Sequence, residues 1–572
     1  MIDDAAEVDD VGLFSMSPAQ ESMWFALQLT PDPAYHVPYR VRLDGPLDAG
    51  ALRAALGDLV AQHDALRASF PRTGTELRQR VRSTSAFTLR VTDLVALPPG
   101  AATTRAKELA REPFDLAGGP LLRAELLRLA PDRHELILVV HHLVFDGGSA
   151  RVFFAQLAEA YAARAAHRVP ELPPQPVAYP DLIDAQRVHP SGVDLAYWRN
   201  RLRDMPPPLA LPGSPAPGTP DGLHRVRLTP DLAARVRVAG RRHRCTSFMT
   251  MLAAFAVLLR THTGRTDVVI GSPAADRRRP ETAHAVGLFV NMLPLRVTMT
   301  GAPAFADVLA GVRDAVLDGF GHQIPVEDII RETGPARSGH SPLFQAVFWL
   351  HPAQAEPPAL GDCRTTVEEI FTGAAKYDLT LGVRETPHGT VCDFFYRGTV
   401  LDPAGADRLA TAYVQLLAAL TDPDAVLPSL PPPASTAATA TATATAATAT
   451  AATATARPTA ESAGLLAGRI AEVWREVLDV PVVGSQDNFF DLGGHSRLML
   501  RVQGLLAERL GADVSMLDLF DHPTVAALAG HLAATAPPET SGDDPPETSG
   551  DDSAERRRAG ALRLRQAKGR PE

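Results

Sequence analysis

The chain contains 572 residues, enough for several folded domains at the usual ~100–200 residues each. Its hydrophobic share of 45% and its charged share of 21% are ordinary for a soluble globular protein. The formal net charge of −10 is modest for this length, which argues against a nucleic-acid partner.

Neither membrane insertion nor a cysteine-based site is indicated. No apolar run is long enough to span a bilayer, and the acidic start at residues 1–7 is unlike a signal peptide, so we expect no membrane segment and a cytoplasmic location. The three cysteines, Cys245, Cys363 and Cys392, are scattered and odd in number. They predict neither a disulfide framework nor a zinc site, and we expect no metal.

Composition divides the chain into four segments. Residues 12–430 mix helical and strand patterns, as expected for a large α/β domain. Residues 431–460 are proline and then threonine and alanine, and they predict a disordered linker because they have no apolar face to bury. The pattern of residues 461–535 predicts a compact helical domain. Residues 536–572 hold the octapeptide PPETSGDD twice, then a basic end, and predict a disordered tail.

Within the first segment, the pattern HHxxxDG follows an apolar run at residues 136–140 that predicts a buried strand. It comprises His141, His142, Asp146 and Gly147, and a second glycine follows. Strand alternation directs the two imidazoles to opposite sides, so only one can face a cleft, while the glycines allow a sharp backbone turn. A neutral imidazole accepts a proton from an amine or hydroxyl near pH 7. A lone histidine here would usually be a satisfied core residue beside an Asp-Gly turn.

The whole pattern resembles the active-site motif of nonribosomal peptide synthetase condensation domains, in the chloramphenicol-acetyltransferase-like superfamily. Further segments resemble the family in the same order along the chain. They are residues 15–24, 62–70, 197–198 (the start of the helix between the lobes), 270–277, 286–291, 322–327 and 341–345.

The resemblance implies an α/β (α+β) pseudo-dimer of two lobes, at about residues 12–190 and 195–430. These lobes would face each other across a tunnel that carrier-bound substrates enter from opposite ends. It also implies that Asp146 is structural and pairs with Arg277. Here the residue before Arg277 is an aspartate where the family has glycine, so Arg278 and Arg279 are alternative partners.

His142, the second histidine, would point into that tunnel, with His141 and Gly147 completing the catalytic motif. An amine would attack a thioester through a tetrahedral oxyanion. His142 would either take the amine proton as a general base or orient the amine while proximity supplies most of the acceleration. Sequence leaves both routes open.

The helical segment contains residues 487–496 (DNFFDLGGHS), which resemble the attachment motif of peptidyl carrier proteins. Glycines end a loop and Ser496 opens a helix, where a phosphate on its hydroxyl is favourably placed. The resemblance implies 4'-phosphopantetheine on Ser496, within an all-α four-helix bundle. Arg497 departs from the family's apolar residue after the serine.

No adenylation domain or glycine-rich phosphate loop separates the two domains. We therefore expect a condensation–carrier didomain that forms an amide, or an ester, between a donor acyl thioester and an acceptor on Ser496. A separate adenylation enzyme would load the acceptor in trans. Further partners would be a phosphopantetheinyl transferase and an upstream carrier protein or synthetase that delivers the donor.

Two alternatives come from different functional classes. One is a free-standing acyltransferase that acts on a soluble amine or alcohol, and the other is a non-catalytic recruitment platform with the same fold. Epimerization domains share the HHxxxDG core but normally follow their carrier. Heterocyclization domains replace the histidines with aspartates. The intact His142 and Asp146 favour catalysis.

Overall fold

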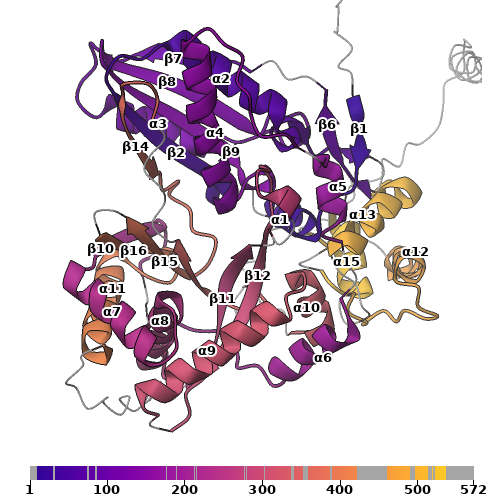
Figure 1. Ribbon diagram of the computed structural model, residues 1–572. Coiled ribbons are helices and arrows are strands. Elements are labelled where there is room, and N and C mark those ends of the chain that lie inside the picture. Colours follow the sequence, from indigo (N-terminus) through magenta and orange to yellow (C-terminus); the bar gives the residue numbers. More distant parts are fainter. Residues whose placement is uncertain are drawn as a thin grey trace, which may run out of the picture.

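The computed structural model describes residues 10–421 and 460–535 with short gaps. The gaps are 30–32, 74–75, 84–86, 176, 188–189, 212, 214, 276, 278–279, 302, 336–340, 352–358, 387–388, 490–491, 493–495, 513, 515–517 and 520–521. Two α/β lobes are followed by a small helical unit (Figure 1). The predicted linker up to residue 459 and the predicted tail at 536–572 lie outside the described residues, as do Arg278 and Arg279.

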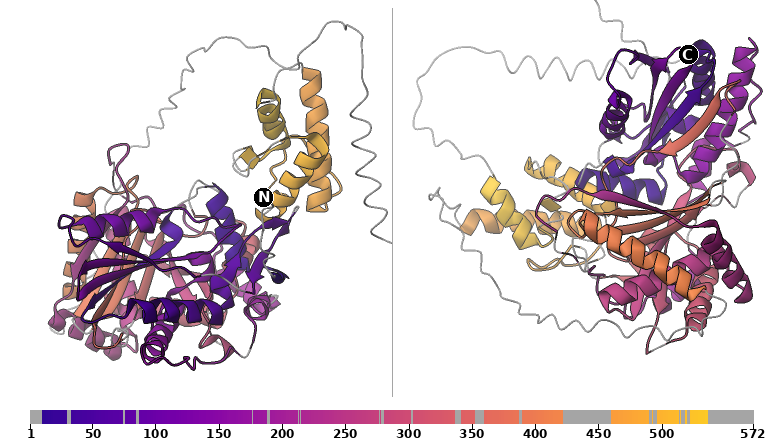
Figure 2. Two further views of the ribbon diagram at one scale, coloured as in Figure 1. Left: turned by 90° about the horizontal axis from the view of Figure 1, so that it is seen from above. Right: turned by 90° about the vertical axis from the view of Figure 1, so that its left-hand side faces the viewer.

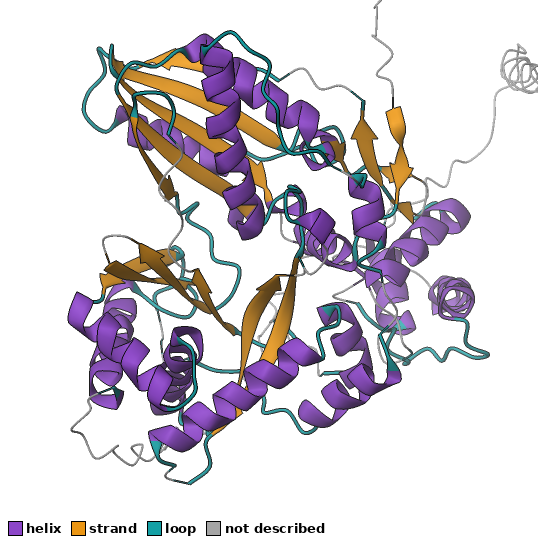
Figure 3. Cartoon of the chain, in the orientation of Figure 1, coloured by secondary structure: helices purple, strands orange, loops and turns teal. Residues whose placement is uncertain are grey.

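The N-lobe is built on a five-stranded sheet in the order β14-β2-β9-β8-β7. Alternating side chains of β9 enter two cores: Leu136 and Leu138 pack with helices α2 and α4, while Ile137 and Val139 pack with α3. This sheet is therefore covered by helices on both faces (Figure 3). The elements are β2 (His36–Asp44), α2 (Ala49–Gln62), β7 (Arg90–Asp93), α3 (Ala101–Arg111), β8 (Leu122–Ala130), β9 (Arg133–His141) and α4 (Gly147–Ala165).

One strand of this sheet comes from the distant C-terminal half. Strand β14 (Arg364–Glu369) pairs antiparallel with β2, and Arg40 of β2 donates to Glu368 of β14 at 3.2 Å. The predicted division at about residue 190 therefore does not separate the lobes completely. Because β14 covers an edge of β2 that would otherwise be open, the exchange also links the lobes.

The C-lobe contains a mixed six-stranded sheet in the order β10-β16-β15-β13-β11-β12. Helix α8 is almost entirely buried in its core. Among the described residues, no single helix is long and apolar enough to cross a bilayer, and α7 and α8 meet that test only as a pair bent by 100°. The elements are β10 (Gly222–Arg227), α7 (Pro230–Arg242), α8 (Ser247–Thr263), β11 (Asp267–Ala275), β12 (Val290–Thr298), α9 (Phe305–Gly321), β13 (Ala346–His351), β15 (Leu379–Thr386), β16 (Gly389–Tyr396) and α11 (Pro403–Leu420).

Smaller elements complete the two lobes, and one of them is the helix predicted between the lobes. The helix that contains Tyr197 and Trp198 begins earlier than predicted, at Gly192, because Ser191 caps it through the amide of Asp194. Trp198 is fully buried and donates to the carbonyl of His322 at 2.7 Å. The elements are β1 (Asp10–Phe14), α1 (Pro18–Leu29), β3 (Ala68–Ser69), β4 (Arg72–Thr73), β5 (Glu76–Leu77), β6 (Gln79–Arg82), α5 (Tyr179–Asp184), α6 (Gly192–Arg201) and α10 (Val326–Thr333).

The C-terminal unit is helical, as predicted. Helices α12 (Ala460–Leu478), α13 (Ser496–Leu510) and α15 (Val525–Thr535) enclose a core that includes Trp474 and Leu506. Much of the region expected to form the remaining helix of the bundle, near residues 515–524, lies outside the described residues. Helix α13 contacts α1, and two further views show the unit beside the first residues of the N-lobe (Figure 2).

Candidate active site

The HHxxxDG residues form the connection from β9 to α4. Strand β9 ends at His141, a short 3₁₀ turn covers His142–Val144, and Asp146 caps helix α4 by accepting from the amide of Ser149 at 2.7 Å. An aspartate at this position is a favourable helix cap because its side chain satisfies an amide that has no partner within the helix. The motif therefore positions its own turn and starts the following helix.

His141 is a structural member of this turn. It is buried, and its Nδ1 accepts a hydrogen bond from the amide of Leu143 at 3.1 Å. Its ring lies edge-on to the rings of His36 and Phe114, with centroids 5.8 and 5.7 Å apart. Burial lowers the pKa of His141 well below its usual value. Since Nδ1 accepts a bond, the neutral ring carries its proton on Nε2.

His142 has a different environment. It is partly buried, and its Nδ1 makes no hydrogen bond to a residue in the described part of the chain. Burial, together with the positive charge of Lys376 from the C-lobe, lowers the pKa of His142 to about 3, although Asp146 opposes this shift. The imidazole is therefore neutral at pH 7, and it retains a lone pair that a substrate can use.

Asp146 and Arg277 join the two lobes. Nη2 of Arg277 lies 2.8 Å from Oδ1 of Asp146, and the two side chains are only 11% and 4% exposed. Nη1 of Arg277 donates to the carbonyl oxygens of Thr282 and Ala285 at 2.7 and 2.8 Å. The guanidinium also lies over the ring of Phe289, 4.6 Å from its centroid. Such a buried ion pair depends on its additional hydrogen bonds to offset the loss of water.

Two participants in this network were missed by the sequence analysis. The hydroxyl of Ser149 lies 2.8 Å from both Oδ1 of Asp146 and the carbonyl of Gly287, and it accepts from the amide of Gly287 at 3.0 Å. The amide of Phe289 donates to Oδ2 of Asp146 at 2.9 Å. Residues 286–291 were singled out only as a resemblance, and no local pattern shows that their backbone reaches Asp146.

The glycines after Asp146 permit close approach rather than a sharp turn. Both belong to helix α4, and neither is among the glycines with positive φ. A methyl group on Gly148 would lie 2.5 Å from Nε of Arg277, and one on Gly147 would lie 3.3 Å from Cε1 of His351. Each glycine thus allows a side chain of the C-lobe to lie against the start of α4.

A cavity of about 620 Å³ lies between the lobes. None of the HHxxxDG residues is among its lining residues, but Thr282 and Phe289 are, and their backbones bond to Arg277 and Asp146, so the cavity shares a wall with that network. The charged residues that line it are Asp194 and Glu327, without a lysine or arginine among the described lining residues. Burial raises the pKa of Glu327 to about 7, and the nearby carboxylates of Asp328 and Glu21 act in the same direction. The cavity therefore suits a group that donates hydrogen bonds.

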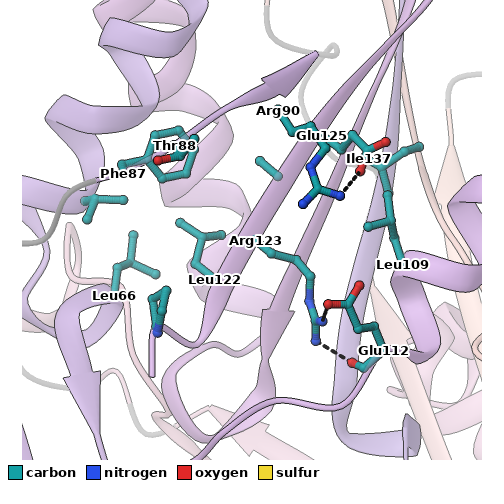
Figure 4. Close-up of a pocket in the computed structure, with 13 residues that line it drawn as sticks. Leu66, Phe87, Thr88, Arg90, Leu109, Glu112, Leu122, Arg123, Glu125 and Ile137 are labelled. Atoms are coloured by element: carbon teal, nitrogen blue, oxygen red, sulfur yellow. Dashed lines mark hydrogen bonds and ion pairs between the residues drawn. The ribbon is translucent and has the colours of Figure 1, made fainter. Parts of the chain in front are cut away.

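A second cavity, of about 290 Å³, lies in the N-lobe beside β8 (Figure 4). Its charged side chains are already paired: Arg123 lies 3.4 Å from Glu112, and Arg90 lies 3.8 Å from Glu125. Neither the HHxxxDG residues nor the residues that bond to Asp146 and Arg277 line it. It is therefore separate from the candidate active site.

Ser496 is the first residue of α13. The first amides of a helix lack partners within the helix and favour a phosphate, so this position fits the attachment of phosphopantetheine. Helix α13 contacts α1, and Pro18 and Ala19 at the start of α1 line the larger cavity. The carrier unit therefore lies next to an element that borders the cavity between the lobes.

Two known protein families match this chain, one for each of its two parts. The condensation domain family matches residues 12–436, and the phosphopantetheine attachment site family matches residues 468–532. A linear gramicidin synthase of Brevibacillus parabrevis is 36% identical over 434 residues, which is 73% of this chain but 8% of that protein. The chain thus spans only a small part of this relative.

Solved structures have the same architecture. The first condensation domain of the calcium-dependent antibiotic synthetase, in complex with a substrate analogue, is 26% identical with a TM-score of 0.63, covering 73% of this chain and 98% of that one. The X-domain from teicoplanin biosynthesis, in complex with OxyB, is 28% identical with a TM-score of 0.62, covering 72% and 93%. The predicted chloramphenicol-acetyltransferase-like fold is confirmed by these likenesses. The chain therefore belongs to the condensation-domain family and continues into a domain of the kind that holds 4'-phosphopantetheine on a serine.

Proposed function

We propose that this chain forms an amide or ester bond in nonribosomal peptide synthesis, by joining a donor acyl thioester to an acceptor on its own carrier domain. The observation that carries the proposal is the neutral ring of His142, whose buried Nδ1 atom has no hydrogen-bond partner among the described residues. A core histidine would normally be satisfied by a partner, as His141 is.

The reaction requires little covalent chemistry from the protein. The acceptor nitrogen bonds to the thioester carbon, the carbonyl oxygen becomes an oxyanion, and the carbon–sulfur bond then breaks. The proton that the nitrogen loses passes to the departing thiolate. A ring with a pKa of about 3 is a weak base, so His142 mainly orients the amine by accepting its hydrogen bond, and it holds the proton only briefly during collapse of the intermediate.

Asp146 and Arg277 act on this site indirectly. Asp146 accepts bonds from α4, from Arg277 and from the amide of Phe289, so it fixes the end of the His142 turn against the C-lobe. Its carboxylate is fully engaged by these bonds. We assign it a structural role, with Gly147 and Gly148 providing the space that the contacts between the lobes need.

The carrier domain supplies the acceptor. When attached to Ser496, phosphopantetheine provides a thiol that holds the acceptor as a thioester. The contact of α13 with α1, which borders the larger cavity, supports delivery from this side. Asp194 and Glu327 line that cavity, and their carboxyl groups can accept hydrogen bonds from an incoming amine.

Loading requires other enzymes. Only residues 437–467 separate the two family matches, too few for an adenylation domain, which supports loading in trans by a separate adenylation enzyme. A phosphopantetheinyl transferase would modify Ser496. An upstream carrier protein or synthetase would bring the donor.

The intact mass of the protein after treatment with coenzyme A and a broad-specificity phosphopantetheinyl transferase tests the carrier assignment. One added phosphopantetheine is expected, and it should be absent from Ser496→Ala. An unmodified but folded wild-type protein would contradict the assignment. The free-standing acyltransferase would then be favoured, and release of product onto a soluble amine would be assayed.

A recruitment platform is the second candidate function. The likeness to the X-domain that was solved in complex with OxyB favours it, because that structure shows this fold bound to a partner protein. A platform would bind a partner and leave loaded donor and acceptor thioesters unreacted. Formation of the condensation product excludes this candidate as the complete function.

A further inference from the structure

His351, which the sequence analysis did not single out, contacts the active-site motif from the opposite lobe. It is the last residue of β13 in the C-lobe sheet. Its Cε1 and Nε2 atoms lie 3.3 and 3.4 Å from the position that a methyl group on Gly147 would occupy. Gly147 follows Asp146 directly, so the imidazole of His351 lies against the end of the HHxxxDG turn.

Neighbouring residues hold this imidazole in place. The ring of Trp349 lies beside it, with centroids 4.5 Å apart and planes inclined by 33°. Trp349 in turn packs over Gly382 of β15, where a methyl group would lie 2.1 Å from the indole. On β15, Arg384 is the register partner of His351. Two strands of the C-lobe sheet therefore fix the ring.

The imidazole remains available to a ligand. The residue is exposed to solvent although it lies between the lobes, and the imidazole of His351 makes no hydrogen bond to another described residue. Burial among the surrounding atoms and the charge of Arg384 lower the pKa of His351, while Asp146 raises it less. At pH 7 the ring is neutral and has one N–H donor and one acceptor nitrogen.

We propose that His351 is a further catalytic residue for the condensation: its N–H binds the carbonyl oxygen of a carrier-bound thioester beside Gly147. This inference rests on the proposed function. As the amine nitrogen attacks, negative charge develops on that oxygen, and the hydrogen bond strengthens. No bond to His351 forms or breaks, because the proton from the nitrogen still leaves with the thiolate.

The test compares His351→Phe, which keeps a flat ring without a donor, with His351→Gln, which keeps an N–H donor. The apo carrier is loaded directly from glycyl-, leucyl-, phenylalanyl- or lysyl-coenzyme A by the phosphopantetheinyl transferase, which transfers the aminoacyl-phosphopantetheine to Ser496. Acetyl- and octanoyl-pantetheine thioesters serve as donors. The combination of donor and loaded acceptor that gives the most product is then used to measure two quantities. These are the rate at saturating donor and the half-saturating donor concentration.

His351→Phe should lower the saturating rate by about a hundred- to a thousandfold, as expected for the loss of one donor to an oxyanion. The half-saturating concentration should change by no more than about threefold, and His351→Gln should restore most of the rate. His243→Phe, at the C-cap of α7 and among the lining residues of neither cavity, is the matched control and should leave the rate unchanged.

Equal rates for His351→Phe and His351→Gln would overturn the inference, as would a loss confined to the half-saturating concentration. A melting temperature measured for each variant separates these results from misfolding. If His142→Ala is inactive while His351→Phe is fully active, only this inference fails. If no pair yields product with the wild-type protein, or if His142→Ala matches the wild type, the proposed function fails instead.

Discussion

Arg277 of the C-lobe lies 2.8 Å from Asp146 of the N-lobe, and both side chains are almost completely buried. The same guanidinium reaches two backbone carbonyls, and the same carboxylate reaches the amides of Ser149 and Phe289. This pair therefore couples the turn that contains His142 to the facing lobe. The stability of this ion pair and the position of the His142 turn are therefore linked.

Replacing Arg277 with alanine should destabilise the protein by about 3–5 kcal/mol, because it leaves the buried carboxylate of Asp146 without its charged partner. Urea unfolding measures this change. Arg364→Ala is the matched control, since its ion pair with Asp44 is exposed and should contribute no more than about 1 kcal/mol. Equal losses for the two variants would contradict the structural role of Arg277.

Gly148→Ala should be destabilising through a steric clash. The new methyl group would lie 2.5 Å from Nε of Arg277, whose position is fixed by its hydrogen bonds. We expect a loss of about 1–3 kcal/mol, as for overpacking in a core. Gly311→Ala, in helix α9 with open space around it, should instead stabilise by roughly 0.5–1 kcal/mol. If urea unfolding shows that Gly148→Ala leaves the free energy of unfolding unchanged, Arg277 can move aside without a loss of stability, which would contradict this prediction.

The buried His63 makes stability dependent on pH. Its Nε2 lies 2.7 Å from Oε1 of Gln156, and burial lowers its pKa to about 4. In the unfolded chain a histidine has a pKa near 6.5, so between about pH 6.5 and 4 the unfolded state binds more protons. Stability is therefore fully present above this window and is lost as the pH falls through it.

The loss from His63 should reach about 2 kcal/mol at pH 5. Urea unfolding at pH 7.5 and at pH 5.0, compared between the wild type and His63→Gln, measures it. The variant should lose less stability than the wild type over this interval by that amount. An identical loss in both proteins would show that His63 does not titrate as its burial implies.

Sequence patterns predicted the parts of this fold that depend on local order. The apolar run at residues 136–140 is a buried strand. The two histidines after it have different surroundings, as predicted, but strand alternation is not the cause, because β9 ends at His141 and His142 begins a 3₁₀ turn. Asp146 and Ser149 also have the spacing of a helix cap and the amide that it accepts from, although this cap was not among the predictions. Such features can be predicted because they depend only on residues that are close together in the sequence.

Features that join distant segments were not predictable in the same way. Strand β14 crosses to the N-lobe sheet because the edge of β2 is free there, and no property of residues 364–369 alone indicates this partner. His351 contacts Gly147 across 204 positions of sequence (351 − 147), through the packing of two lobes. The sequence of β13 shows a histidine at the end of an apolar strand, and only the tertiary arrangement gives it a place in the site.

The most direct test of the central claim is a condensation assay in a single turnover. The carrier is loaded with an aminoacyl group on Ser496 and mixed with a donor thioester, and the mass of the carrier-bound product is followed over time. The wild type should add the donor acyl group to the loaded arm. His142→Ala should form this product about 10²–10⁴-fold more slowly, the range for loss of a positioned acid–base group. Product formation by His142→Ala at the wild-type rate would contradict the account.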